Sequence, residues 1–167
     1  MIRIKLAAVA ALAAICASTL APASAATNIA TLGVTATVTN NCDVQTQPAA
    51  LTMSYNELDN VGTLGLSSFT WACTNGAAAS VTPTSTNNGG GSNWKAVNGG
   101  ANLLYLLYND SACSANQLKN GTADSLGNAN GNTTTYNICG IPSTSPAQNS
   151  AVNSYTDTVT FTFNFNP

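Results

Sequence analysis

Near the end of the chain, residues 157–165 read Asp-Thr-Val-Thr-Phe-Thr-Phe-Asn-Phe. Apolar and polar side chains alternate along this stretch from Thr158 onward. Because successive side chains of a β-strand point to opposite faces, this pattern is typical of a strand with one face in a core and the other in water. We therefore predict a strand here, with an apolar face made of Val159, Phe161, Phe163 and Phe165.

A second alternating run lies near the start of the chain, at residues 31–39. Threonines and a glycine separate its apolar positions, which are Leu32, Val34, Ala36 and Val38. The same period of two predicts another strand here.

Four further strands are predicted between these two runs, at residues 64–73, 80–83, 103–108 and 133–138. Residues 103–108 are continuously apolar, which favours a central strand covered on both faces. Within residues 64–73 the apolar phase changes, which favours a β-bulge at Ser67–Ser68. Segments rich in Asn and Gly separate the runs and predict turns. Short strands at this spacing indicate an all-β sandwich.

The composition excludes several classes of function. The chain has 167 residues, no histidine, 4 Lys+Arg and 6 Asp+Glu, so imidazole acid–base chemistry and histidine metal sites are absent. So few cations cannot neutralise a nucleic-acid backbone. The glycine-rich residues 87–92 lack the Lys-Ser/Thr pair and the helix of a phosphate-binding loop. We predict one domain without cofactor, metal or nucleic-acid partner.

The first 25 residues have the features of a cleaved secretory signal peptide. Arg3 and Lys5 precede an uncharged apolar run at residues 6–20, and small residues follow at positions 23–25. That run is shorter than the ~20 residues that span a bilayer, so we expect no integral membrane segment after cleavage. Residues 26–167 then carry two lysines and six carboxylates, a net charge of −4.

Cleavage would also remove Cys16 and leave an even number of cysteines, in a compartment that permits disulfides. Four cysteines allow three connectivities. No close C-x-x-C pair is present for zinc or for redox catalysis. The remaining cysteines are Cys42, Cys73, Cys113 and Cys139.

We predict no catalytic residues. Asp110 and Asp157 stand at strand boundaries, where a carboxylate commonly accepts hydrogen bonds from turn N–H groups. Neither Lys95 nor Lys119 lies in the Ser-x-x-Lys context that a serine nucleophile would need without histidine.

Two groups of motifs carry a resemblance to a known family. One is Tyr-Thr-Asp-Thr-Val-Thr-Phe-Thr-Phe at 155–163. The other is Leu-Tyr-Leu-Leu-Tyr-Asn-Asp at 104–110, followed by Gly-Ile-Pro at 140–142 and by Gln148. Together they resemble the spore coat U domain, the subunit fold of archaic (Csu-type) chaperone–usher pili. The resemblance spans most of residues 27–167.

The resemblance implies an incomplete immunoglobulin-like sandwich that lacks its final strand and is completed by a neighbour's N-terminal extension. Only two residues follow Phe165, so we expect no strand of this chain after it. Residues 26–40 would be the donor-strand extension and residues 41–167 the domain. The strand with Val159, Phe161, Phe163 and Phe165 would border the acceptor groove, and the donated side chains would be Leu32, Val34, Ala36 and Val38.

The resemblance also implies partners and a location. The partners would be neighbouring subunits, a periplasmic chaperone and an outer-membrane usher. The chain would be secreted through the periplasm into a surface pilus that supports adhesion and biofilm formation.

The family's pattern pairs Cys42 with Cys73. Cys113 and Cys139 are not part of that pattern. Their pairing would tie the end of the 104–110 motif to the Gly-Ile-Pro connection.

Alternatives from other classes stay open at this point. Residues 31–39 could be the first strand of a complete sandwich. The chain could be a secreted spore-coat, cyst-coat or matrix protein of the same fold, assembled without an usher. It could also be a single-domain carbohydrate-binding adhesin, for which Trp94 is the candidate sugar platform. An enzyme is the weakest alternative, and Asp110 and Asp157 are the residues that would test it.

Overall fold

The computed structural model describes residues 31–166. Internal contacts divide the chain into two units, residues 1–36 and residues 37–167. The predicted signal peptide, residues 1–25, and the first five residues of the predicted extension lie outside the described residues. All regular structure in the described part of the chain is β-strand.

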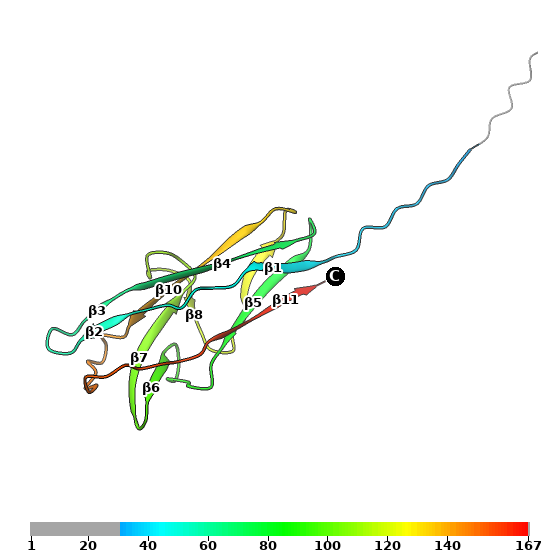
Figure 1. Cartoon of the computed structure of the whole chain (residues 1–167). Helices are drawn as coiled ribbons and strands as arrows, with labels where there is room; N and C mark the ends of the chain where they lie inside the picture. The colour runs from blue at the N-terminus through cyan, green and yellow to red at the C-terminus, as the bar shows by residue number, and fades with distance from the viewer. Residues whose placement is uncertain (1–30, 167) are drawn as a thin grey trace, which may run out of the picture. The chain divides into compact units, whose positions relative to one another are not determined.

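Most strands of the second unit form two antiparallel sheets (Figure 1). The first sheet has the order β1-β4-β10-β7-β6, with β8 paired to β7, and the second has the order β11-β5-β9. A separate hairpin pairs β2 with β3. The bounds are β1 Cys42–Thr46, β2 Ser54–Asn56, β3 Val61–Thr63, β4 Gly65–Cys73, β5 Ala78–Thr84, β6 Trp94–Asn98, β7 Ala101–Tyr108, β8 Gln117–Leu118, β9 Asp124–Asn128, β10 Thr134–Pro142 and β11 Thr160–Asn166.

The alternating C-terminal run forms β11, which pairs with β5 along its length. Two of its three phenylalanines meet aromatic side chains of the first sheet. The ring centroids of Phe161 and Phe69 are 5.9 Å apart, and those of Phe163 and Trp71 are 5.3 Å apart. Phe69 also stacks on Tyr136 at 4.9 Å. Such pairs bury large apolar area and add roughly 0.5–1.5 kcal/mol beyond burial. The prediction of an all-β sandwich is confirmed.

The prediction for the strand at residues 64–73 is right in place but wrong in detail. The ladder between β4 and β10 runs without a register shift from Trp71 to Gly65, so there is no bulge at Ser67–Ser68. Gly65 is buried, whereas Leu64 and Leu66 are 45% and 54% exposed. The apolar pattern wrongly predicted a bulge because the inward positions at this end of β4 hold the small residues Gly65 and Ser67, while the leucines point outward.

Residues 103–108 lie within β7, which pairs with β10 on one side and with β6 on the other. The strand is central in its sheet, as predicted. Its two faces differ, because Tyr105 and Leu107 are buried while the intervening leucines are half-buried.

No strand is present at residues 31–39, and no ladder of the described residues includes them. Leu32 is 88% exposed, and Val34 and Val38 are each 81% exposed. A β-strand forms when its N–H and C=O groups find a ladder partner. The strand predicted here is therefore not formed within this single chain.

The start of β1 is fastened to the end of β4. Cys42 and Cys73 are the first register pair of the two strands, and they form a disulfide. Next to this pair, the Thr74 hydroxyl accepts a hydrogen bond from the Asn41 N–H at 3.0 Å, and the Thr74 N–H donates to the Asn41 carbonyl at 2.8 Å.

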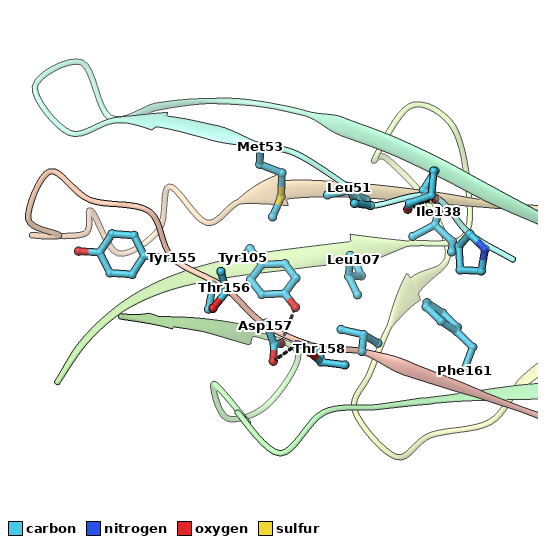
Figure 2. A pocket seen from close by; sticks show the side chains of 16 residues that line it. Leu51, Met53, Tyr105, Leu107, Ile138, Tyr155, Thr156, Asp157, Thr158 and Phe161 are labelled. Atoms are coloured by element: carbon cyan, nitrogen blue, oxygen red, sulfur yellow. Dashed lines mark hydrogen bonds between the residues drawn. The ribbon is translucent and has the colours of Figure 1, made fainter. Parts of the chain in front are cut away.

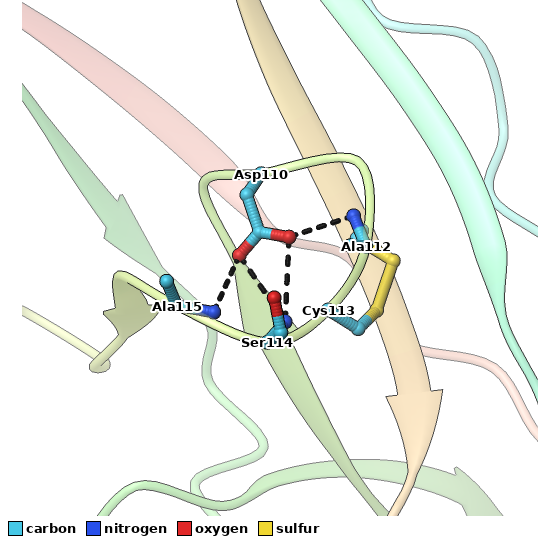
Figure 3. The surroundings of a disulfide bond; sticks show 6 residues. Asp110, Ala112, Cys113, Ser114 and Ala115 are labelled. Atoms are coloured by element: carbon cyan, nitrogen blue, oxygen red, sulfur yellow. Dashed lines mark hydrogen bonds between the residues drawn. A yellow bond between two sulfur atoms is a disulfide. The ribbon is translucent and has the colours of Figure 1, made fainter.

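The second disulfide joins Cys113 to Cys139 of β10 and holds the loop that follows β7 (Figure 3). In this loop the Asp110 carboxylate accepts hydrogen bonds from the N–H groups of Ala112 and Ala115, at 2.7 and 2.8 Å. These backbone hydrogen bonds, that of Ala115 foremost, lower the pKa of Asp110. Asp110 therefore stabilises a turn by accepting backbone hydrogen bonds, as the sequence predicted.

Gln148 ties the connection after β10 to the neighbouring strand β7. Its side-chain amide donates to the carbonyls of Leu104 and Ser143, at 2.8 and 2.6 Å, and its carbonyl oxygen accepts the Leu104 N–H. The Gln148 carbonyl oxygen thus supplies the acceptor that an adjacent strand would offer to the Leu104 N–H, while the Leu104 carbonyl also accepts the Ser143 N–H at 2.9 Å.

Candidate functional site

A cavity of about 460 Å³ opens along one side of the sandwich (Figure 2). One wall is formed by residues 48–53, and the opposite wall by residues 155–161, the segment that leads into β11. The floor consists of side chains from the first sheet, namely Ser67, Ala96, Tyr105, Leu107 and Ile138. We call this feature the groove. Its lining is mainly apolar, and in Figure 2 Leu107 and Ile138 lie between the two walls.

The groove lies where the sheets carry no further strand. β11 is an end strand of its sheet and pairs with β5 alone. The opposite wall, residues 48–53, has no strand assigned to it. An unpaired strand edge presents a row of free backbone N–H and C=O groups, which is a template for an added strand. The groove therefore has an apolar floor, and its second wall leads into this unpaired edge, of which Phe161 lines the groove.

The wall that leads into β11 is attached to both sheets. Thr156 and Val97 of β6 exchange two backbone hydrogen bonds, of 2.9 and 3.0 Å. One residue later, Asp157 accepts hydrogen bonds from the hydroxyls of Tyr105 and Ser85, each at 2.6 Å, and from the Asn87 amide at 3.0 Å. Asp157 thus fixes the point where the chain crosses from the first sheet to the second.

Two tyrosines of the first sheet donate to carboxylates across the sandwich. Tyr105 of β7 donates to Asp157, and Tyr136 of β10 donates to Asp124 of β9 at 2.7 Å. Burial of each phenol, together with its hydrogen bond to the carboxylate, raises the pKa of Tyr105 and of Tyr136 above the ordinary value. Both hydroxyls therefore stay protonated and act as donors that join the two sheets.

A second hollow, of about 880 Å³, adjoins the groove and shares lining residues with it, among them Leu51, Met53 and Tyr155. It is bordered by the β2–β3 hairpin and by residues 150–155. Leu58, in the turn of that hairpin, is 96% exposed. The groove thus adjoins a hollow of mixed polar and apolar lining, which includes Asn56, Glu57 and Asn153.

Of the four residues predicted to border an acceptor groove, two line the groove and two do not. Val159 and Phe161 line the groove. Phe163 packs instead on Trp71 in the core, and Phe165 lies outside the groove lining and is 42% exposed.

Sequence reasoning missed the first wall and most of the floor. The wall residues Pro48–Met53 are largely apolar but have no strand period, so no periodic signal marks them. The floor residues stand on four strands and converge only in the folded domain. A proline followed by an apolar stretch before a polar hairpin is the sequence feature that could have marked this wall.

Trp94 does not fit the alternative of a carbohydrate-binding platform, and that interpretation is wrong. Its side chain is 0% exposed, and its indole N–H donates to the Leu118 carbonyl at 3.1 Å. A sugar platform needs an exposed aromatic face. Trp94 is a core residue whose polar atom is satisfied internally.

Within residues 31–166, no group of three or more acidic or cysteine side chains is placed to hold a metal ion. The same described region contains no helix of the length and apolar character needed to cross a membrane.

Comparisons with known proteins identify the fold and the family. The model of the Spore Coat Protein U domain matches residues 28–162. No curated protein matches the chain. A solved structure of the CsuC–CsuE chaperone–tip adhesion subunit pre-assembly complex, from archaic chaperone–usher Csu pili of Acinetobacter baumannii, matches with a TM-score of 0.53 and 18% identity. That match covers 76% of this chain and 40% of the solved chain.

The P pilus rod subunit PapA is also similar, with a TM-score of 0.49 and 14% identity over 75% of this chain and 99% of PapA. The likeness to the Csu structure confirms the predicted immunoglobulin-like sandwich. Because the family model covers far more than half of the sequence, the chain belongs to the Spore Coat Protein U domain family.

Proposed function

We propose that this chain is a structural subunit of an extracellular chaperone–usher pilus, and that its groove accepts the N-terminal extension of a neighbouring subunit. The observation that carries the proposal is the groove itself. It is a mainly apolar cavity of about 460 Å³ whose second wall leads into the free edge of β11, in a chain whose exposed residues 31–39 alternate like a strand.

The proposed donor and the groove are chemically complementary. No charged residue occurs between Lys5 and Asp43, so the extension can enter an apolar groove without burying a charge. Leu32, Val34 and Val38 would each contribute roughly 1.5–3 kcal/mol on full burial. Each new backbone hydrogen bond to the β11 edge would add about 0.5–1.5 kcal/mol. The smaller Ala36 would fill the position between the two valines.

The arrangement would produce a filament. A subunit that accepts a donor in its groove and donates its own extension forward makes a heterologous contact, and such contacts propagate without closing. A free groove edge is also an aggregation hazard. This supports a periplasmic chaperone as a partner, and the similar Csu structure is a chaperone complex with a tip adhesion subunit.

The proposal includes an outer-membrane usher, export through the periplasm to the cell surface, and a role in adhesion and biofilm formation. It assigns the chain no enzymatic activity. Asp110 and Asp157, the carboxylates that an enzyme hypothesis would use, are engaged in hydrogen bonds that hold a loop and a groove wall.

A peptide titration tests the proposed function. A fluorescent peptide with the sequence of residues 28–40 is titrated with the purified secreted chain, and its anisotropy is followed. We expect saturable binding. A control peptide with Ser at positions 32, 34 and 38 should bind more than about 100-fold more weakly, because three large apolar contacts are removed. No binding, or equal binding of the two peptides, would contradict the proposal.

A further inference from the structure

We infer that two facing glycines, Gly65 of β4 and Gly140 of β10, are positioning residues that set the width of the groove. The inference rests on the proposed function, because it concerns how the same groove admits a donor strand. Gly65 and Gly140 are a register pair of the β4–β10 ladder, and both are buried on the inner side of the sheet.

The first wall of the groove lies directly on this pair. A methyl group at position 140 would come within 2.8 Å of the Leu51 side chain and 2.9 Å of the Met53 sulfur. A methyl group at position 65 would come within 2.8 Å of Leu51 and would overlap the Thr52 carbonyl oxygen. Carbon atoms in ordinary contact are about 3.5–4.0 Å apart. The space above both glycines is therefore already filled by residues 51–53.

A hydrogen bond also fixes the first wall two residues farther along β4, at Ser67. The Ser67 hydroxyl donates to the Ala49 carbonyl at 2.7 Å. Ser67 is the next inward position of β4 after Gly65, and its cross-strand neighbour Ile138 lines the groove floor. The inward residues of β4 thus become smaller from Trp71 toward Gly65. The first wall of the groove packs on the end of β4 where these residues are small.

The side chains that rest on the glycines also line the groove. Leu51 and Met53 line the groove and project from its first wall (Figure 2). Added volume at position 65 or 140 cannot move into the sheet, so it must displace these side chains toward the opposite wall. The absence of two β-carbons is therefore what leaves room for a donated apolar side chain.

The two positions differ in how they can be tested. At Gly65 the obstacle is backbone, so Gly65→Ala must shift the wall itself and is expected to damage the fold. At Gly140 the obstacles are the ends of two flexible side chains. Gly140→Ala is therefore expected to leave the domain folded and to narrow the groove.

The experiment measures binding of the 28–40 peptide to the full secreted chain carrying Gly140→Ala. We expect binding at least about tenfold weaker than that of the parent chain, the scale of overpacking strain in a fitted site. Gly100→Ala is the matched control, because a β-carbon at Gly100 meets no atom within 4 Å. It should change binding by less than about twofold.

A double-mutant cycle with Leu51→Ala distinguishes a loss of peptide affinity caused by a narrower groove from a loss caused by general destabilisation. Leu51→Ala removes the two Leu51 methyl carbons that the new methyl group would meet and leaves space into which the flexible Met53 side chain, whose sulfur is the other obstacle at 2.9 Å, can move. It has some cost in affinity of its own. In that background Gly140→Ala should alter affinity by less than about twofold, because the two changes act through the same contact. If Gly140→Ala alone fails to fold, recovery of folding and of binding in the double variant supports the inference.

The other possible outcomes of the binding measurements distinguish failure of the inference from failure of the proposed function. Unchanged peptide affinity of folded Gly140→Ala overturns the inference but leaves the proposed function standing, since the parent chain binds. Equal losses with and without Leu51 also overturn it, because the effect would not pass through the wall. If the parent chain itself binds no peptide, the proposed function fails and takes the inference with it.

Discussion

Val34→Asp is expected to abolish polymer formation, whereas Thr35→Asp should leave it intact. The two positions are neighbours, but in an extended strand their side chains point to opposite faces. Val34 belongs to the apolar set that would enter the groove, and Thr35 to the set that would face water. Burying an unpaired carboxylate costs several kcal/mol, enough to offset most of the gain from donor burial.

The measurement compares the two variants after export with a cognate chaperone and usher. Polymers are separated on an SDS gel without heating. We expect a ladder for the parent chain and for Thr35→Asp, and monomer for Val34→Asp. Loss of the ladder in both variants, or in neither, would show that the alternation of residues 31–39 does not determine assembly.

Asp157→Ala is expected to lower the free energy of unfolding of the domain by about 2–4 kcal/mol. A hydrogen bond to a charged group contributes roughly 1.5–3 kcal/mol, and a buried donor without an acceptor costs about 1–3 kcal/mol. The substitution removes the acceptor of the Tyr105 hydroxyl, whose residue is 4% exposed, and of the Ser85 hydroxyl. Such a loss is a large fraction of the ~5–15 kcal/mol of a typical domain.

Urea denaturation of the monomeric chain measures this effect. Asp43→Ala is a suitable control, because Asp43 is exposed and its carboxylate accepts a hydrogen bond from the nearby Gln45 side chain. The control should change stability by less than about 0.5 kcal/mol. An Asp157→Ala variant as stable as the control would show that the hydrogen bonds at the sheet crossing do not hold the wall.

Five of the eleven strands in residues 31–166 were predicted from alternating or continuous apolar runs, namely β4, β5, β7, β10 and β11. The run ending in Phe165 marks a strand that packs on one face, and the apolar run at 103–108 marks a central strand. The pattern failed at Ser67–Ser68 for a physical reason. The inward positions Gly65 and Ser67 are small because another segment of the chain lies on them, and a single strand's pattern does not record that segment.

The candidate site was predictable in part for the same reason. Val159 and Phe161 were found because they belong to the alternating run at residues 158–165. Leu51 and Met53 were missed because their segment has no regular structure. Trp94 was misplaced because a glycine-rich neighbourhood suggested exposure, whereas an interior hydrogen bond to the Leu118 carbonyl allows the indole to be buried.

The most direct test of donor-strand assembly compares a chain whose mature part is residues 26–167 with a version whose mature part starts at Asn40. Both are exported behind residues 1–25, with a cognate chaperone and usher, and are run on an SDS gel without heating. Donor-strand assembly predicts a ladder of oligomers from the full chain, which collapses to monomer on boiling and is absent from the shortened version. Folded monomers from both versions, or equal ladders from both, would contradict it.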